Sequence, residues 1–468
     1  MIIKSSEKNM DILTKKVKGA EDILPSEAYK WQFVEALMRD EASKSGFKEI
    51  RTPVFEHTVL FNRSVGETTD VVQKEMYTFD TKGGESITLR PEGTAGAARA
   101  YLEHALYNDG LPVKVFYQLT CYRYEKAQAG RQREFHQFGM ETYGAADAKA
   151  DAEMICAANN IFERLGLSNI RLEINSIGCK TCRKDYTNAL KEYFGQHKAE
   201  LCETCLSRLD RNPMRILDCK NESCKKISEN APVVLDYICQ DCSKHFGRVK
   251  TFLDAADVEY TVNPNIVRGL DYYTRTVFEF VTDTIGAQGT VCGGGRYDGL
   301  IEELGGQPTP ALGFAMGIER LMLVMKAENI EPPDEDVCDL YIAALGEDAE
   351  LRAFSLAQEL RNASISAEID IVGRGLRAQM KYANKIQARY SMVIGDDDLS
   401  NNSVKVKNMK TGESFDAPLD ENFLESFIEH VVDNNEFDGF SAGLMSNIFG
   451  EKLQNILDIF QENGDGDE

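Results

Sequence analysis

Hydrophobic positions recur at helical spacing near the start of the chain and then alternate in longer, strand-like stretches. Residues 31–46 carry apolar side chains every three or four positions, which predicts an amphipathic helix. Residues 113–122 and 135–143 are strand-like, and the polar, basic segment 123–134 separates them. This pattern predicts a long hairpin with a charged loop at its tip.

A second strand-like pattern begins near residue 258 and continues through residues 276–280. A glycine-dense turn is expected at residues 293–295, and an apolar helix is expected over residues 314–326. The stretch 328–336 is rich in proline and acidic residues, which predicts a linker between two domains.

The region after this linker alternates strands and helices in βαβ fashion, which predicts a small α/β domain. We expect strands at 339–344, 367–371 and 391–394 and helices at 349–362 and 375–389. An acidic tail follows.

Composition narrows the class of protein. The 468 residues are 43% hydrophobic and 28% charged, as in soluble globular proteins, and this length suits two or three domains. The chain has no apolar run long enough for a membrane span and no apolar signal-peptide core, so we expect a cytoplasmic protein. The net charge is −23, yet residues 372–390 hold five basic residues and no acid.

Arginine, glutamate and tyrosine residues gather in short segments that favour chemistry on a carboxylate and a phosphate. An arginine fork can hold both groups together, which suits arginine better than lysine. Taken singly, each arginine would more commonly form a solvated ion pair, so the prediction rests on their joint occurrence. The segments are 89–94, 122–141, 268–273, 293–300 and 313–321.

Together these segments resemble the histidyl-tRNA synthetase family, from Lys18 to about Glu429. Residues 46–56, around Pro53, are similar to motif 1 of class II aminoacyl-tRNA synthetases. The segments beginning at Tyr122 and Gly313 resemble motifs 2 and 3. The other signatures, which begin at Arg268 and Gly293, are peculiar to the histidine enzymes and a regulatory paralogue of them.

The resemblance implies an α+β fold. The catalytic domain would be a six-stranded, mainly antiparallel sheet with helices against it, joined by a small helical, cysteine-rich insertion and a C-terminal α/β anticodon-binding domain. Motif 1 would form the interface of a homodimer. The expected divisions are the catalytic domain at 1–178 and 248–327, the insertion at 179–247, the linker at 328–336, the anticodon-binding domain at 337–430 and the acidic tail at 431–468.

The resemblance also implies the ligands, namely ATP with Mg²⁺, L-histidine and histidine tRNA. Arg123 and Arg268 would be catalytic at the α-phosphate, where Arg268 stands in place of the metal ion of other class II enzymes. Glu141 and Tyr273 would select the imidazole, and Tyr297 would line the same pocket. The implied histidine-binding residues are Glu92, Gly93, Thr94, Arg123, Gln137, Glu141, Arg268, Tyr272 and Tyr273, and the ATP-binding residues are Arg123, Glu125 and Arg320.

Two regions are implied in tRNA contact. The motif 2 loop, with Gln128 as its candidate, should meet the acceptor end, although residues 126–130 depart from the common family pattern. In the C-terminal domain, basic residues four positions apart would form one stripe of a helix. A stripe without acids in an acidic protein favours phosphate contact over a plain solvated face. Its members are Arg377, Lys381, Lys385 and Arg389.

Eight of the twelve cysteines lie in the insertion, mostly in closely spaced pairs. Two-residue spacing lets two thiolates reach one tetrahedral ion, so the pairs could build one or two four-thiolate zinc sites. The alternative is reduced thiols without metal. A zinc-stabilised helical clamp on the tRNA acceptor arm is the corresponding hypothesis. The pairs are Cys179 and Cys182, Cys202 and Cys205, Cys219 and Cys224, and Cys239 and Cys242.

The sequence leaves two other functions open. One is the catalytically silent paralogue that regulates ATP phosphoribosyltransferase, which usually lacks the C-terminal domain. The other is an RNA-binding module without ligase activity. The presence of Glu92, Arg123, Arg268 and Arg320 together favours the histidine–tRNA ligase over both.

Overall fold

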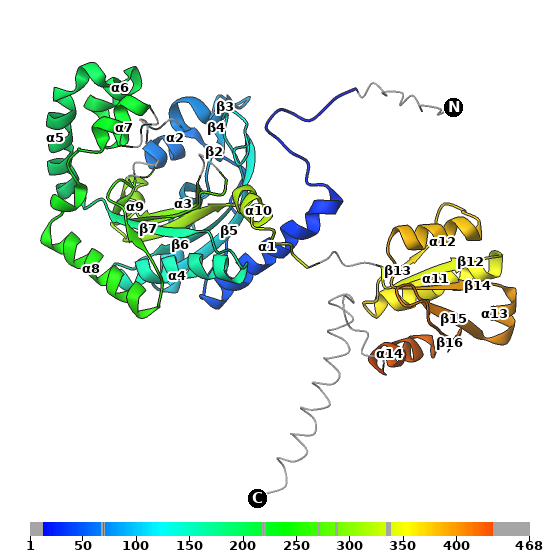
Figure 1. Cartoon of the computed structure of the whole chain (residues 1–468). Helices are drawn as coiled ribbons and strands as arrows, with labels where there is room; N and C mark the ends of the chain where they lie inside the picture. Colours follow the sequence, from blue (N-terminus) through cyan, green and yellow to red (C-terminus); the bar gives the residue numbers. More distant parts are fainter. Residues whose placement is uncertain are drawn as a thin grey trace, which may run out of the picture. The chain divides into compact units, whose positions relative to one another are not determined.

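The computed structural model describes most of the chain as two compact units, one within residues 1–332 and one within residues 333–468 (Figure 1). The described residues are 13–66, 69, 71–217, 219, 221–266, 268, 272–285, 289–333 and 338–433. Residues 269–271 of the predicted signature, residues 334–336 of the predicted linker and the predicted tail from residue 434 onward lie outside this description. Among the described residues, no helix is both long and apolar enough to cross a membrane.

In the described part of the first unit, eight strands form the main sheet, and its six long central strands are antiparallel. This confirms the predicted antiparallel sheet, to which two-residue parallel strands add an edge at each side. In order across the sheet, the strands are β1 (Lys48–Glu49), β5 (Val113–Tyr122), β6 (Glu134–Tyr143), β11 (Ala311–Gly317), β10 (Thr290–Arg296), β9 (Thr274–Val281), β7 (Arg171–Ser176) and β8 (Thr261–Val262).

One face of this sheet carries the main hydrophobic core. Large side chains of alternate strand positions, such as Phe138, Phe278 and Phe314, point into it because successive residues of a strand face opposite sides. Helix α4 begins after Asp147, whose carboxylate caps the backbone N–H of Lys149 at 2.9 Å. The covering helices are α1 (Pro25–Lys44), α4 (Ala148–Arg164), α8 (Gln240–Ala255) and α10 (Ile318–Ala327).

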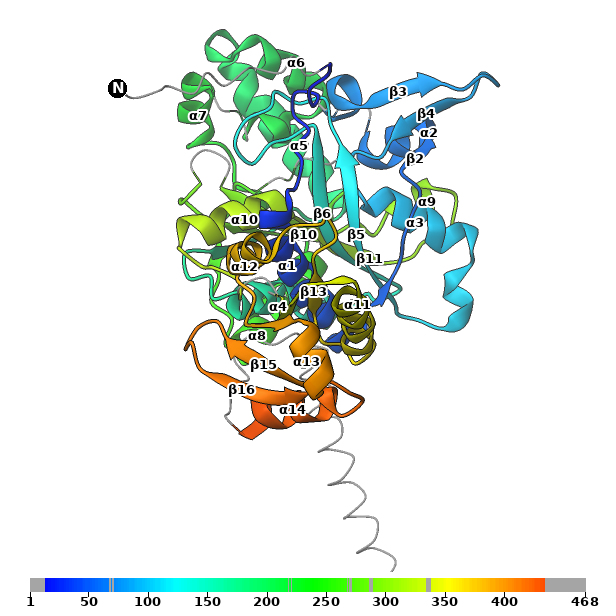
Figure 2. The ribbon, with the colours of Figure 1, turned by 90° about the vertical axis from the view of Figure 1, so that its right-hand side faces the viewer.

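At the centre of the sheet, the opposite face carries small and polar residues. The positions of β11 that alternate with Phe314 are Gly313, Ala315 and Gly317, and those of β6 include Gln137 and Glu141. Figure 2 shows the three-stranded sheet near α2 and α3. The elements on this side are α2 (Thr58–Phe61), α3 (Thr94–Glu103), α9 (Leu300–Glu303), β2 (Phe55–His57), β3 (Tyr77–Asp80) and β4 (Ser86–Leu89).

Two predicted elements are wrong. Residues 293–295 lie within β10 and form no turn, and residues 314–317 belong to β11, so α10 begins only at Ile318. The glycines serve close approach, because a Cβ at Gly294 would lie 2.4 Å from the carbonyl oxygen of Gly313 on the next strand.

The insertion is helical, and its buried aromatic and aliphatic residues share one core with residues of the catalytic domain such as Tyr143, Tyr297 and Leu300. Figure 1 shows α5, α6 and α7 grouped together, while α8 runs back beside α4. The expected boundary at residue 247 stays a prediction, and α8 extends across it. The helices are α5 (Lys180–Gln196), α6 (Glu203–Arg211), α7 (Glu222–Ser228) and α8.

The described part of the second unit is an α/β domain, as predicted. Its five-stranded sheet begins with three parallel strands and ends with two antiparallel ones. The predicted helix at 375–389 is shorter and ends at Lys385, with Gln387 in a left-handed conformation beyond it. The elements are β13 (Ala367–Ile369), β12 (Leu340–Ala344), β14 (Tyr390–Ile394), β15 (Ser403–Asn408), β16 (Ser414–Pro418), α11 (Glu347–Asn362), α12 (Leu376–Lys385), α13 (Asp396–Asn401) and α14 (Phe423–Asp433).

Candidate active site

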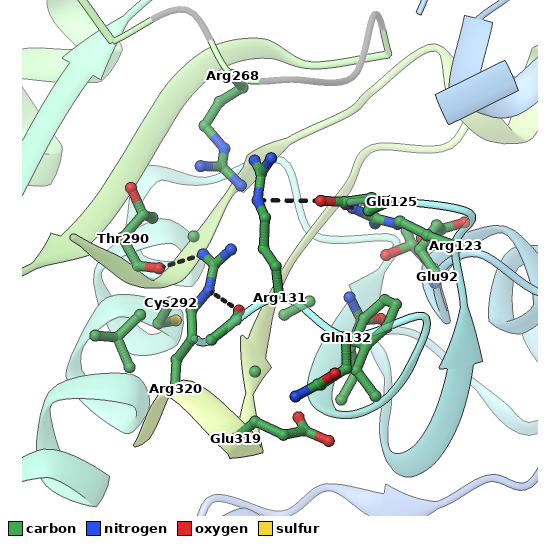
Figure 3. Close-up of a pocket in the computed structure, with 18 of the residues that line it drawn as sticks. Glu92, Arg123, Glu125, Arg131, Gln132, Arg268, Thr290, Cys292, Glu319 and Arg320 are labelled. Carbon is green, nitrogen blue, oxygen red and sulfur yellow. Dashed lines mark hydrogen bonds and ion pairs between the residues drawn. The ribbon is translucent and has the colours of Figure 1, made fainter. Parts of the chain in front are cut away.

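A cavity of about 290 Å³ lies on the polar face of the main sheet. Arg123, Arg268 and Arg320, which are far apart in the sequence, all line it. Figure 3 shows the guanidinium groups of Arg131, Arg268 and Arg320 pointing toward a common space. The other lining residues include Glu92, Thr94, Glu125, Gly130, Gln132, Phe135, Gln137, Tyr272, Tyr273, Thr290, Cys292, Gly293, Ala315, Gly317 and Glu319.

Arg268 is held against the sheet. Its guanidinium pairs with the carboxylate of Glu279 on β9 and lies 5.5 Å from the ring centre of Tyr273. Burial disfavours the charged guanidinium, but Glu279 and Tyr273 outweigh it and hold the pKa of Arg268 above its usual value. A Cβ at Gly293 would lie 2.4 Å from Nη1 of Arg268, so only glycine leaves room for this side chain. Arg268 therefore stays charged and fixed.

Arg320, from the first turn of α10, donates hydrogen bonds to two backbone oxygens. Its Nε donates to the carbonyl oxygen of Gly130 at 3.0 Å, and its Nη1 donates to that of Thr290 at 2.7 Å. Burial and the nearby charge of Arg131 lower the pKa of Arg320. A cationic group that is held near other cations is stabilised by an anion in the cavity.

The motif 2 hairpin supplies two arginines to the cavity. Nε of Arg123 donates to the carbonyl oxygen of Pro91 at 2.8 Å, and its guanidinium lies 5.3 Å from the ring centre of Phe135. Arg131 reaches the carboxylate of Glu125 at 3.0 Å. Arg131 lies in the basic segment 123–134, for which the sequence predicts a charged loop without a role for this residue. Nothing in the sequence around Arg131 distinguishes it from the other arginines of the loop.

Glu92 lies at the start of α3, with its carboxylate against the helix N-terminus. Its oxygens accept from the backbone N–H groups of Thr94 at 2.7 Å and Ala95 at 2.9 Å. Burial raises the pKa of Glu92, and these two donors oppose that rise. Thr94, which follows Gly93, turns its hydroxyl toward β6.

Glu141 is fully buried near the C-terminal end of β6. Its carboxylate accepts from Thr94 at 2.8 Å, from Tyr117 at 3.0 Å and from the hydroxyl of Tyr297. Burial raises the pKa of Glu141 to about 8, against the effect of these donors. A Cβ at Gly313 would lie 1.6 Å from the carboxylate, which therefore fills the space a side chain would take.

The structure brings most of the predicted ligand-binding residues together, with exceptions. Within the described residues, Gly93, Glu141 and Tyr297 do not line the cavity; Glu141 and Tyr297 lie behind Thr94. Tyr297, which is expected to line the pocket, is not among the residues of the cavity wall, and its hydroxyl donates to Glu141. Gln128 is exposed at the hairpin loop, outside the cavity.

The predicted basic stripe lies in the second unit. Arg377, Lys381 and Lys385 are exposed on α12, whose buried positions are Gln379 and Ala383. Arg389 is not part of the stripe, because it follows the end of the helix and its Nε lies 3.6 Å from the carboxylate of Asp339.

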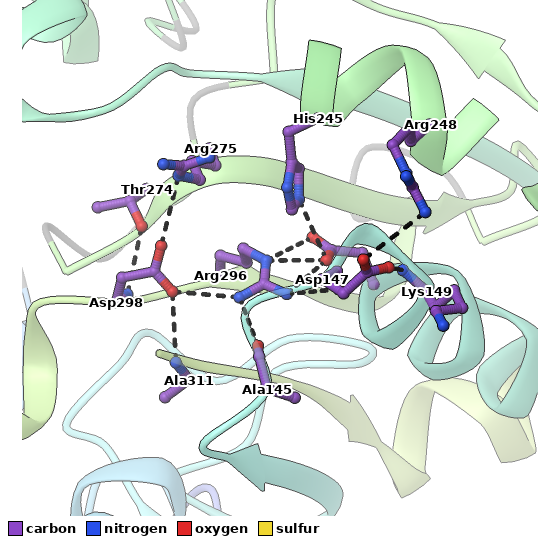
Figure 4. A network of polar contacts seen from close by, with 11 residues as sticks. Ala145, Asp147, Lys149, His245, Arg248, Thr274, Arg275, Arg296, Asp298 and Ala311 are labelled. Atoms are coloured by element: carbon purple, nitrogen blue, oxygen red, sulfur yellow. Dashed lines mark hydrogen bonds and ion pairs between the residues drawn. The ribbon is translucent and has the colours of Figure 1, made fainter. Parts of the chain in front are cut away.

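Arg296, from the 293–300 signature, belongs to a buried network (Figure 4). Its Nε donates to Asp151 on α4 at 2.8 Å and its Nη1 donates to the carbonyl oxygen of Ala145 at 2.9 Å. Nε2 of His245, on α8, lies 3.2 Å from the same Asp151 carboxylate. Burial opposes ionisation of Asp151, but His245 and Arg296 hold its pKa below the usual value. The network ties sheet, α4 and insertion together behind the cavity.

An antiparallel sheet with an arginine-lined cavity on one face, in a chain with a separate α/β unit, fits the class II aminoacyl-tRNA synthetases. The family model "Histidyl-tRNA synthetase" matches residues 19–321, and the model "Anticodon binding domain" matches residues 339–428. The chain belongs to the histidyl-tRNA synthetase family.

Similar proteins agree with this placement. The chain is 54% identical over 410 residues to the histidine–tRNA ligase of Caldanaerobacter subterraneus, a match that covers 88% of this chain and 98% of that protein. It is 53% identical over 402 residues to the histidine–tRNA ligase of Clostridium novyi, covering 86% and 96%. The apo histidyl-tRNA synthetase structure from S. aureus is 39% identical, with a TM-score of 0.77, covering 89% of this chain and 100% of that one.

Proposed function

We propose that the chain joins L-histidine to its tRNA in two steps. First, a histidine carboxylate oxygen attacks the α-phosphorus of ATP; pyrophosphate leaves and histidyl-adenylate forms. Then a terminal ribose hydroxyl of the tRNA attacks the adenylate carbonyl, and AMP leaves. The observation that carries this proposal is the convergence of Arg123, Arg268 and Arg320 on one cavity, with Glu141 buried behind its wall.

The arginines suit the triphosphate end of the reaction. No side-chain nucleophile is needed, so positioning and charge stabilisation supply most of the rate gain. Arg268 would stabilise charge at the α-phosphate, Arg123 would bridge that phosphate and the histidine carboxylate, and Arg320 would hold the γ-phosphate. Glu125 completes the ATP site. Mg²⁺ enters as part of the substrate, on the β- and γ-phosphates.

The acidic and phenolic residues suit histidine. Glu92, Thr94 and Gln137 line the cavity. Glu92 and Thr94 can accept from the α-amino group of histidine, and Gln137 would face the carboxylate end. Glu141 and Tyr273 would select the imidazole ring, with Glu141 directly behind Thr94. Buried hydrogen-bonding groups of this kind reject a ligand that cannot satisfy them, which is the strong form of selectivity.

Contact with tRNA would use both units. Gln128, which is exposed at the hairpin loop, would meet the acceptor end, and the basic stripe of α12 would meet the phosphate backbone. We also propose that the chain is a homodimer and works in the cytoplasm, where its tRNA substrate is found.

Histidine-dependent exchange of pyrophosphate into ATP tests the first step. We expect exchange with L-histidine and none with the other amino acids, followed by charging of histidine tRNA when it is added. A regulatory paralogue would show no exchange and would instead stimulate ATP phosphoribosyltransferase, and an RNA-binding module would show neither; either result would overturn the proposal.

A further inference from the structure

The eight cysteines of the insertion fold into two groups of four. The first group, called the neck site, is Cys179, Cys182, Cys239 and Cys242. The second group, called the inner site, is Cys202, Cys205, Cys219 and Cys224. Within each group all four Sγ atoms lie within 4.8 Å of one another. The spacing of the pairs indicated possible metal ligands, but only the fold shows which pairs combine.

The sulfur separations match a tetrahedral zinc site. A Zn–S bond of about 2.3 Å places the sulfurs of a tetrahedron about 3.8 Å apart. The Sγ atoms of Cys179 and Cys182 are 3.5 Å apart, and those of Cys182 and Cys242 are 3.9 Å apart. In the inner site, Cys202 and Cys219 are separated by 3.8 Å. All twelve cysteines of the chain are free thiols.

The backbone around each group favours ionised sulfur. Cys179, Cys202 and Cys239 directly precede α5, α6 and α8, so three pairs begin at the positive end of a helix. The backbone N–H of Cys239 donates to Sγ of Cys182 at 3.0 Å. The backbone N–H of Cys202 donates to Sγ of Cys224 at 3.3 Å. Such donors are the usual outer contacts of metal-bound thiolates.

We propose that the insertion holds two structural Zn²⁺ ions, one in each four-thiolate site. Four thiolates fill the tetrahedron and leave no open position for substrate, which makes both sites structural. The neck site joins the residues where the chain enters the insertion to those where it leaves. An insertion of this size buries little core of its own, so metal crosslinks would supply much of its stability.

The neck site is also connected to the cavity. Arg183, in the first turn of α5, donates from Nη1 to the carbonyl oxygen of Tyr273 at 2.6 Å. On α8, His245 follows Cys242 by one turn and reaches the buried Asp151. Zinc at the neck would therefore fix the helix that positions Tyr273, whereas the inner site has no such contact among the residues described.

Metal analysis of the full-length chain tests the proposal. Protein purified under reducing conditions without chelator should contain about two zinc ions per chain, and titration of its thiols with a mercurial should release both. Protein in which Co²⁺ replaces zinc at the same sites should show the charge-transfer absorption of thiolate ligands. Wild-type protein with eight titratable thiols in the insertion and no zinc would overturn the proposal, as would protein with disulfides at these positions.

Paired variants separate the two sites. Cys239→Ser with Cys242→Ser, and Cys219→Ser with Cys224→Ser, should each retain one zinc, while the control Cys156→Ser, outside the insertion, retains two. The neck variant should raise the KM for histidine about tenfold, and the inner variant should leave it unchanged. This kinetic part rests on the proposed function, whereas zinc content does not. If either variant fails to fold, release of zinc from the wild-type chain still decides the question.

Discussion

Glu141 has no contact with solvent, and three hydroxyl groups surround its carboxylate. A carboxylate in this position costs stability when it is ionised, because burial disfavours the charge more than the three donors favour it. A buried group that costs stability in this way fits a role for Glu141 in recognising the ligand. The sequence could indicate that Glu141 matters through its motif, but not that it lies behind the wall, because that depends on which strand residues face Thr94.

The pH dependence of stability should report on Glu141. Its pKa is about 8 in the folded chain and 4.5 as the reference value, so folding takes up a proton between these values. The contribution of protonated Glu141 to the free energy of unfolding is fully present below about pH 4.5. It falls by up to about 1.4 kcal/mol per pH unit as the pH rises and is lost above about pH 8. The melting temperature of the wild type relative to Glu141→Gln should therefore fall as the pH rises from 5 to 8, on the order of a few degrees. A difference that is constant with pH would contradict this.

Arg268 should act in the chemical step more than in binding. Arg268→Ala is expected to lower kcat for pyrophosphate exchange by about 100-fold or more, because fixed charge at the α-phosphate is lost. The KM values for histidine and ATP should change much less. The matched control is Arg171→Ala, because Arg171 is an exposed guanidinium paired with Asp283 at 2.7 Å. A rise in KM with kcat unchanged would assign Arg268 to binding alone.

At the scale of elements, the pattern of hydrophobic and polar positions predicted the hairpin β5–β6 and the helices α1, α11 and α12. The prediction failed where glycine residues allow neighbouring strands to pack closely. The glycines at 293–295 suggest a turn, but they lie in β10. Glycine is needed there because Arg268 and the neighbouring strand come too close for side chains. The apolar residues that open β11 looked helical because a buried strand and a buried helix have the same composition over such a short run.

The basic stripe of α12 gives a prediction at this scale. Lys381→Glu with Lys385→Glu should weaken binding of histidine tRNA by about tenfold or more at low salt and reduce its salt dependence. Pyrophosphate exchange should stay at the wild-type rate, because α12 belongs to the other unit. Lys405→Glu, on an exposed strand position of the same unit, is the control. Equal loss of exchange would indicate a structural role for the stripe.

At the scale of the molecule, apolar side chains are exposed around the motif 1 segment. Phe55 is 56% exposed, Val59 55% and Phe79 49%, and all three belong to or adjoin the three-stranded sheet. Exposed apolar groups that gather on one surface are typical of an interface with another chain. The homodimer was predicted from motif 1, and this surface is where we expect its partner.

Phe55→Arg should therefore break the homodimer. Light scattering on an exclusion column should give about twice the chain mass of 52.4 kDa for the wild type and about that mass for the variant, with unchanged circular dichroism. Leu351→Arg, which alters an apolar residue of the second unit that is 71% exposed, should remain dimeric. A wild-type chain that elutes as a monomer would refute the prediction.

The absent side chain at Gly313 constrains any effort to redirect the enzyme to another amino acid. The Glu141 carboxylate occupies the space that a methyl group at position 313 would take. Substitutions at position 141 or at position 313 alone should therefore not give a functional new pocket. Libraries that vary one residue at a time should yield inactive clones at Gly313. Only libraries in which a smaller residue replaces Glu141 together with a larger one at position 313 should reach a differently shaped pocket.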